Sequence, residues 1–394
     1  MKVYMDNGAT TQVIPEAVKE MKPYFNKKFG NPSSLHYLGE EAHEDVDKAR
    51  ETIAKSINAL PEEIIFTSGG TEADNLAIFG AVYANKSKGK HIITTKIEHN
   101  AVKNCFKHLE KEGFQVTYLE VDEEGFVKDF DKALTEDTIF VSVIHANHEI
   151  GVIQDIEKIG KVCREKGILF HTDACQSFTK TELDVKKQSL DLVALNGHKI
   201  HGPKGVGALY VRKGVKINRI NEGGPQEFNL RAGTENVPLL IGFAKSVEVA
   251  MKDYEKNKKY VSKLRDNLME NLLKIPDTKL NGPKDMTKRT FNNLNITFNF
   301  IEGEAILMHL SLKGICVSTG SACSSQSLEP SAVLMSLGLR HEQAHGAIRF
   351  TLSKFNTEKE IGYVVKQVKE VVESLRKLTT FTKEYSIEQI RNRK

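Results

Sequence analysis

Short apolar runs alternate along the first two thirds of the chain with longer segments whose apolar residues recur every three or four positions. The runs have the length and residue types of buried strands, and the longer segments have helical periodicity, as over 155–166. Strands are predicted at 64–67, 91–94, 116–119, 139–144, 168–170 and 192–195. Regular alternation of strands with helices predicts an α/β fold with a largely parallel sheet covered on both faces.

The two ends of the chain follow other patterns. A strand at 3–5 precedes predicted helices over 15–29 and 39–57, the first with Pro15 at a favourable first position. From 236 to about 273 the periodicity is helical, and charged residues at 252–259 mark a domain boundary. The remaining predicted elements are strands at 294–298, 315–318 and 347–352 and helices over 302–312 and 358–378. They indicate a smaller α+β domain.

A glycine-punctuated loop, 195–205, lies between the apolar runs 190–195 and 206–211 and carries Lys199 with a histidine on either side. Burial between strands disfavours the charged ammonium. A neutral lysine amine is a nucleophile that forms a Schiff base, so Lys199 is a candidate covalent anchor for a cofactor. The alternative is a hairpin with a solvated lysine at its tip.

A predicted strand is joined to a predicted helix by a turn with two glycines and two hydroxyl residues, Ser68-Gly69-Gly70-Thr71-Glu72. Free N–H groups and the helix dipole at such a position suit a phosphate. The turn lacks the lysine and spacing of a P-loop and does not match G-x-G-x-x-G. Taken alone, it is also consistent with a simple helix cap.

Polar residues follow several of the other strands, among them His99, Asn147, His148 and Asp173. Ligands of such sheets lie beyond the carboxyl ends of the strands. A carboxylate at the end of a buried strand needs a cationic partner, and a protonated pyridine nitrogen is one. Pyridoxal phosphate (PLP) sites combine a lysine with an acidic partner for the ring nitrogen. Asp173 and Lys199 fit those two roles.

Metal binding is the main alternative for the histidines that follow the strands. None of them forms H-E-x-x-H or a comparably specific motif, so no metal site is expected. The residues concerned are His99, His145, His148, His171, His198 and His201.

Composition limits the classes of protein. The 394 residues are 40% hydrophobic and 27% charged, as in an ordinary globular protein, with a net charge of +4 that does not indicate nucleic-acid binding. No stretch approaches the roughly 20 apolar residues that span a bilayer. The N-terminus turns polar too early for a signal peptide, so we expect a cytoplasmic protein. Six basic and two acidic residues at 376–394 form a tail that is either solvated or docks on an acidic partner.

The five cysteines contain no C-x-x-C pair, which argues against a disulfide framework or a structural zinc site. Cys105, Cys163 and Cys316 lie in predicted helices or strands and are expected to pack. Cys323 differs, because it lies in a run of small polar residues, as reactive accessible thiols do. Arg349 lies in an apolar strand and needs an anion, either a substrate carboxylate or an internal glutamate.

These motifs together resemble the NifS/IscS group of cysteine desulfurases, PLP enzymes of the class V aminotransferase family. The resemblance runs from Asp6 to about Lys377. It rests on Asn31-Pro32-Ser33-Ser34, Thr67-Ser68-Gly69-Gly70-Thr71-Glu72, Asp173-Ala174-Cys175-Gln176-Ser177, Gly197-His198-Lys199-Ile200, Arg231-Ala232-Gly233-Thr234-Glu235-Asn236, Ser321-Ala322-Cys323-Ser324 and Arg349-Phe350.

The resemblance implies a PLP-dependent fold type I homodimer with a mostly parallel seven-stranded sheet. The large PLP-binding domain would span 16–255. The small domain would comprise 1–15 and 256–394 and carry the catalytic cysteine loop. L-cysteine would be the substrate, and an iron–sulfur scaffold protein or a tRNA-thiolation enzyme would be the sulfur acceptor.

The resemblance also implies roles for single residues. Lys199 would carry PLP, and His99 would stack on its ring. Cys323 would accept sulfur, without a resident metal but with transient cluster ligation left open. Arg349 and Asn31 would bind substrate. Asp173 would pair with the ring nitrogen, Gln176 and either Asn147 or His148 would contact the ring hydroxyl, and Gly70, Thr71, Asn196, His198 and the other subunit's Thr234 would hold the phosphate.

The sequence departs from the family pattern at several positions. Asparagine is usual where His148 stands, and serine is usual at Asn196. Selenocysteine lyase and aminotransferase activities share the PLP site and stay open as alternatives, as does a sulfur-transfer scaffold without PLP chemistry. Intact Lys199, Asp173 and Cys323 favour the desulfurase.

Overall fold

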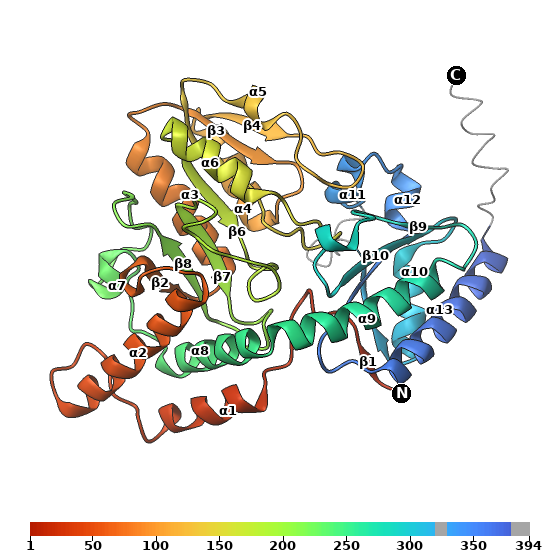
Figure 1. The fold of residues 1–394 in the computed structure, drawn as a ribbon, viewed down its shortest axis with the longest axis horizontal. Helices are drawn as coiled ribbons and strands as arrows, with labels where there is room; N and C mark the ends of the chain where they lie inside the picture. Colours follow the sequence, from red (N-terminus) through yellow and green to blue (C-terminus); the bar gives the residue numbers. More distant parts are fainter. Residues whose placement is uncertain (320–328, 380–394) are drawn as a thin grey trace.

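A seven-stranded sheet forms the centre of the larger half of the molecule in the computed structural model, which describes residues 1–319 and 329–379 (Figure 1). Its strands are β2 (Ile64–Thr67), β3 (His91–Thr95), β4 (Gln115–Leu119), β5 (Thr138–Ser142), β6 (Leu169–Asp173), β7 (Leu192–Asn196) and β8 (Gly207–Val211). They lie in the order β2-β8-β7-β6-β5-β3-β4. Neighbouring strands from β7 to β4 run parallel, and β8 runs antiparallel to both of its neighbours. The predicted mostly parallel sheet is confirmed.

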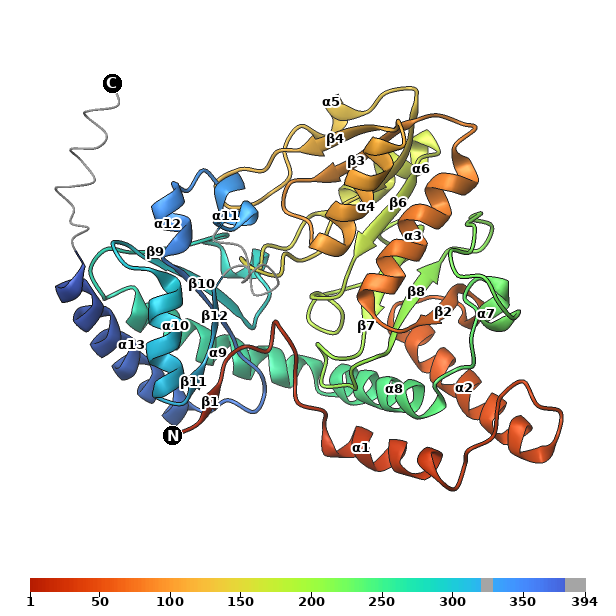
Figure 2. The ribbon, with the colours of Figure 1, turned by 180° about the vertical axis from the view of Figure 1, so that it is seen from behind.

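Alternation of side chains along the strands divides the core into two layers. Ile64 and Phe66 of β2 pack with residues of the helices on one face, whereas Ile65 packs on the opposite face. The first face is covered by α2, α6 and α8, and the second by α3 and α4, as the two opposite views show (Figures 1 and 2). Burial on both faces explains why β2, β5 and β7 carry three or more consecutive apolar residues.

The helices of this half follow the predicted pattern, with differences at their ends. They are α1 (Pro15–Met21), α2 (Tyr37–Ser56), α3 (Gly70–Asn85), α4 (Asn100–Lys111), α5 (Phe130–Ala133), α6 (Ile156–Lys166), the short α7 (Gln226–Asn229) and α8 (Val237–Lys252). The next helix, α9 (Tyr254–Leu272), packs in the core of the smaller half. The helix predicted over 15–29 is wrong in extent, because it gives way to a 3-10 turn at Lys22–Phe25. Pro23 in that turn lacks the N–H that a continuing α-helix would use. The helical stretch predicted from 236 is divided at Asp253, between α8 and α9.

The smaller half combines short strands with helices packed against them. Its elements are β1 (Val3–Tyr4), β9 (Thr278–Leu280), β10 (Asn293–Phe298), α10 (Gly303–Leu312), β11 (Ile315–Cys316), β12 (Ser318–Thr319), α11 (Ala332–Ser336), α12 (His341–His345), β13 (Ala347–Thr351) and α13 (Glu358–Leu378). The strand predicted at 315–318 is two strands, since β11 pairs with β1 and β12 pairs with β13. Val3 and Met5 join the apolar core of this half. The residue bounds given above for two domains stay a prediction.

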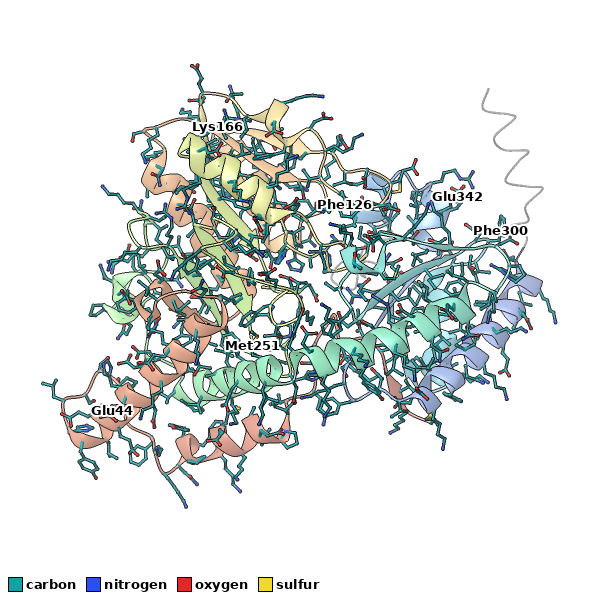
Figure 3. The ribbon with its side chains drawn as sticks, in the orientation of Figure 1. Glu44, Phe126, Lys166, Met251, Phe300 and Glu342 are labelled. Carbon is teal, nitrogen blue, oxygen red and sulfur yellow. The ribbon has the colours of Figure 1, made fainter. Side chains whose placement is uncertain are left out.

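An apolar cluster joins the two halves. Ile150 and Val152, from the loop after β5, pack with Val333 and Leu337 of the α11 region. Figure 3 shows Phe126, which packs on the same cluster, close to this region. The halves therefore meet along side chains from both, beside the carboxyl ends of the central strands. No helix among the described residues is long and apolar enough to cross a membrane.

Candidate active site

The loop that carries Lys199 connects β7 to β8 and folds tightly on itself. Gly202 N–H donates to Gly197 O at 3.0 Å, and Lys199 N–H donates to Asn196 Oδ1 at 3.2 Å. A Cβ at Gly202 would lie 2.8 Å from Gly197 O, which is too close, so the turn requires glycine there. The antiparallel pairing of β7 with β8 matches the hairpin alternative, but Lys199 is half-buried rather than a solvated tip.

The Ser68–Glu72 turn forms one wall of a pocket of about 440 Å³. The pocket is lined by Ala9, Thr10, Ser68, Gly69, Gly70, Thr71, Glu72, His198, Lys204, Gly205 and Val206. Helix α3 begins at Gly70, so its first N–H groups, which have no partners within the helix, lie at this wall. Gly69 has φ of 154°, a backbone conformation that residues with a side chain rarely adopt. Lys204 adds a positive charge to the pocket lining. These features match the chemistry of a phosphate-binding site.

Asp173 is the last residue of β6 and is buried. Its Oδ1 accepts the N–H of Cys175 at 2.8 Å. Burial lowers the pKa of His99, the nearby Asp173 carboxylate raises it, and the Lys199 charge lowers it. His99, Asp173 and Lys199 thus lie within electrostatic range of one another at the carboxyl edge of the sheet.

His99 and His148 face each other, with ring centroids 5.3 Å apart and planes nearly perpendicular. His99 Nδ1 accepts the N–H of Ala101 at the start of α4, which leaves its Nε2 as the protonated nitrogen. His148 Nδ1 is buried and has no hydrogen-bond partner. Burial, followed by the charges of His99 and Arg349, lowers the pKa of His148 well below its usual value.

Asn147 has a structural task in the same loop. Its Nδ2 donates to Ile97 O at 2.8 Å, and its Oδ1 accepts the N–H groups of Glu149 and Ile150. The Asn147 amide is therefore occupied, whereas His148 has a free ring nitrogen. Of the two residues considered for the ring hydroxyl, the contacts favour His148.

The N-terminal segment completes the site, a contribution that the sequence analysis missed. Gln176 Nε2 donates to Gly8 O at 2.9 Å, and Thr10 Oγ1 lies 3.2 Å from His198 Nδ1. Thr11 Oγ1 donates to His198 O at 2.7 Å. The one sequence signal for this contribution is the polar run directly after the first strand. Alone, that run predicts only a turn, because its partners lie far away in the sequence.

Arg349 is 3% exposed and lies on β13 beside this segment. Its Nη1 donates to His148 O at 2.9 Å, its Nη2 donates to Asp6 Oδ1 at 3.0 Å, and its Nε is buried without a partner. The internal partner considered in the sequence analysis was a glutamate. The residue found is Asp6, 343 positions away.

Three predicted site residues do not join this group in the single chain. Thr234 and Asn31 are both exposed, and Asn31 Oδ1 accepts the N–H of Ser33 within its own loop. Cys323 lies outside the described residues. The structure brings together Gly70, Thr71 and His198 at the pocket, and Asp173, Lys199, His99, His148 and Arg349 at the adjoining sheet edge.

Of the three cysteines expected to pack, Cys105 and Cys163 do so and Cys316 does not. Cys105, Cys163 and Cys175 are buried, but Cys316 is exposed. The prediction that Cys316 packs is wrong, because β11 is a two-residue strand and only Ile315 of the pair faces the core.

Within residues 1–319 and 329–379, no three His, Cys, Asp or Glu side chains are grouped to hold a metal ion.

Comparison with known proteins agrees with the fold. Residues 3–364 match the family model described as aminotransferase class-V. The chain is 50% identical over 387 residues to cysteine desulfurase IscS of Clostridium botulinum strain Hall, covering 98% of each chain. It is also 50% identical over 386 residues to cysteine desulfurase IscS of Methanosarcina thermophila, covering 97% of this chain and 95% of that one.

Solved structures give the same result. A NifS-like protein superposes with a TM-score of 0.90 at 38% identity, over 95% of this chain and 100% of that one. A structure titled "SspA in complex with cysteine" has a TM-score of 0.80 at 34% identity, over 90% of this chain and 100% of that one. The fold and site define a member of the class-V aminotransferase family. Within that family, the chain belongs to the NifS/IscS group of cysteine desulfurases.

Proposed function

We propose that this protein is a PLP-dependent cysteine desulfurase that converts L-cysteine to L-alanine and keeps the sulfur as a persulfide on Cys323. The observation that carries the proposal is the convergence of Lys199, Asp173 and a phosphate-type pocket at one edge of the sheet, with Arg349 beside them. The similarity to IscS over nearly the whole chain supports the substrate and reaction.

The residues at the site fit PLP by their chemistry. A phosphate would meet the first N–H groups of α3 together with Thr71 and His198, and Asn196 Nδ2 would be a further donor. Asp173 would hold the positive ring nitrogen, and His99 would cover one ring face. His148 Nδ1 and Gln176 would meet the ring hydroxyl. When bound, PLP supplies an electron sink for the bonds broken at the amino-acid Cα.

Substrate binding falls to Arg349. A guanidinium binds a carboxylate with two parallel hydrogen bonds, and here Nε is free while Nη2 is shared with Asp6. In the proposed complex the L-cysteine carboxylate would compete with Asp6 for Nη2. Nη1 stays on His148 O and fixes the orientation of the guanidinium.

Lys199 would hold the cofactor through its amine, and the same amine would serve as the base for the proton at the substrate Cα. Cys323, as a thiolate, would then attack the substrate sulfur. A sulfur–sulfur bond forms, the carbon–sulfur bond breaks, and the carbon fragment takes up protons to leave as L-alanine. The sulfur remains on Cys323 for transfer to an acceptor.

The proposal extends to partners and place of action. The exposed position of Thr234 suits a homodimer in which each subunit contributes this residue to the site of the other. An iron–sulfur scaffold protein or a tRNA-thiolation enzyme would receive the sulfur in the cytoplasm. Transient ligation of a cluster by Cys323 belongs to the same proposal.

Visible absorbance of the purified protein tests the cofactor site directly. The wild type reconstituted with PLP should be yellow, and Lys199→Ala should lose the absorbance of the lysine-bound cofactor. Lys213→Ala is the matched control, because Lys213 is an exposed lysine beyond the other end of β8. Unchanged absorbance in Lys199→Ala would refute the assignment of the anchor.

A further inference from the structure

A carboxyl group without a lysine or arginine partner is buried beneath the proposed cofactor site. Asp74, in the first turns of α3, has a side chain that is 2% exposed, and its Oδ1 makes no hydrogen bond. Among the described residues, no lysine or arginine lies within ion-pair distance of it. A buried carboxylate in that situation is costly, so the group needs either a proton or an unseen cation.

His171 faces Asp74. His171 Nε2 lies 3.5 Å from Asp74 Oδ1, its side chain is 0% exposed, and Nε2 has no other partner. Two buried polar atoms that each lack a partner satisfy one another when a single proton lies between them. A small side-chain rotation brings this distance within hydrogen-bonding range.

Strand geometry links this pair to Asp173. His171 and Asp173 are two residues apart on β6, so their side chains point to the same face of the sheet, which α3 covers. Ser142 is the partner of His171 on β5, and Ser142 Oγ lies 2.9 Å from His171 Nδ1. Asp74, His171 and Ser142 therefore form a continuous polar chain behind the ring-nitrogen partner.

The electrostatic setting favours a neutral chain. Burial raises the pKa of Asp74 well above its usual value, and the charges of Asp173 and Glu98 raise it further, while Lys199 lowers it. Burial also raises the pKa of Glu98 to about 8 and lowers that of His171 to about 4. The buried thiols of Cys105 and Cys175 also lie within range of Asp74.

We propose that Asp74 is a neutral acid that donates its proton to His171 Nε2, so that Asp173 is the one charged carboxylate beneath the cofactor ring. His171 Nδ1–H then donates to Ser142 Oγ, and Asp74 Oδ1 and His171 Nε2, two buried atoms that lack other partners, satisfy each other. Asp74 and His171 are positioning residues, because they act on the ring through Asp173. The inference rests on the proposed PLP site and assigns a protonation state within it.

Infrared difference spectroscopy of the cofactor-free protein at pH 7 tests the protonation state. Asp74→Asn should remove a carbonyl band of a protonated carboxylic acid. Asp191→Asn is the matched control, since Asp191 is equally buried but lies between Arg164 and Arg212 and should remove only a carboxylate band. Loss of a carboxylate band in Asp74→Asn would overturn the proposal.

Labelling of the wild type with carbon-13 at the aspartate carboxyl tests for a protonated aspartate without any variant. A protonated-acid band that shifts with the label is expected at pH 7, and its absence overturns the proposal even where Asp74→Asn fails to fold. Wild-type protein that fails to bind PLP would instead refute the proposed function and leave the infrared result standing.

Affinity for PLP tests the positioning role. An amide at position 74 also donates to His171, so the dissociation constant for PLP in Asp74→Asn should stay within about threefold of wild type. Asp173→Asn removes the charge itself and should weaken binding about tenfold or more. A loss in Asp74→Asn as large as that in Asp173→Asn would contradict the neutral state of Asp74.

Discussion

Arg349 and Asp6 form an ion pair of 3.0 Å across 343 positions of sequence, so the arginine proposed to bind the substrate carboxylate already faces a carboxylate of its own chain. Burial raises the pKa of Asp6, while Arg349 and the Lys199 charge lower it. If Arg349 binds the substrate carboxylate as proposed, Asp6 and the substrate would share its positive charge, and the N-terminal segment would take part in substrate recognition.

Asp6→Asn should lower the KM for L-cysteine by about threefold to tenfold. The amide keeps an oxygen that accepts from Nη2 but removes the charge that competes with the substrate. Steady-state alanine formation measures the effect, with Asp47→Asn, an exposed change on α2, as control. A rise in KM would mean that the charge of Asp6 is needed to hold Arg349 in place.

Much of this site followed from local sequence patterns. Lys199, Asp173 and the Gly69-Gly70 turn each lie at the end of an apolar run, and a parallel sheet brings the carboxyl ends of such runs to one edge. Strands such as β2, β5 and β7 could be predicted too, because burial on both faces favours consecutive apolar residues.

Other features depend on contacts that no local pattern encodes. The pairing of Asp6 with Arg349 and the place of Gly8 against Gln176 arise only when β1 joins the smaller half. The exposure of Cys316 depends on which side of a two-residue strand meets the core. In the sequence, Asp74 is an ordinary polar position near the start of a helix. Its burial becomes evident only from the packing of α3 on the sheet.

Glu98→Gln should change how stability depends on pH. Burial raises the pKa of Glu98 to about 8, while its Oε1 accepts from Ile144 N–H and Thr95 Oγ1, contacts that a glutamine oxygen can keep. A raised folded-state pKa contributes stability that is complete below the unfolded pKa and is lost as pH rises through the folded one. Between pH 5 and pH 8, the wild type should lose about 3 kcal/mol relative to the variant.

Urea unfolding of the cofactor-free proteins at the two pH values measures this difference. Glu44→Gln, an exposed change on α2, is the control and should follow the wild type. If the wild type and Glu98→Gln lose the same stability between pH 5 and pH 8, Glu98 is already ionised at pH 5. That result would contradict its raised pKa.

Glu227→Gln should destabilise the fold by about 3 kcal/mol. Glu227 is buried, binds Arg50 through both oxygens at 2.7 and 2.8 Å, and accepts the N–H of Phe66. Glu227 and Phe228 have φ of 47° and 56°, so the ion pair also holds a left-handed turn in place. Loss of one partner leaves the Arg50 charge buried and unpaired.

Thermal or urea unfolding of the single and double variants separates the pair from its surroundings. Arg50→Met combined with Glu227→Met should be less destabilised than the sum of the two single changes, because neither charge is then left alone. Strict additivity would show that the two side chains contribute independently.

The central claim is tested most directly by the products formed from L-cysteine. Purified protein reconstituted with PLP should release L-alanine and, with a thiol reductant, sulfide in equal amounts, and Cys323→Ala should bind PLP but form neither. Cys316→Ala, which alters the exposed cysteine of β11, should keep full turnover. Undiminished alanine formation by Cys323→Ala would contradict the assigned sulfur acceptor, and a PLP-loaded wild type that forms no alanine would contradict the desulfurase itself.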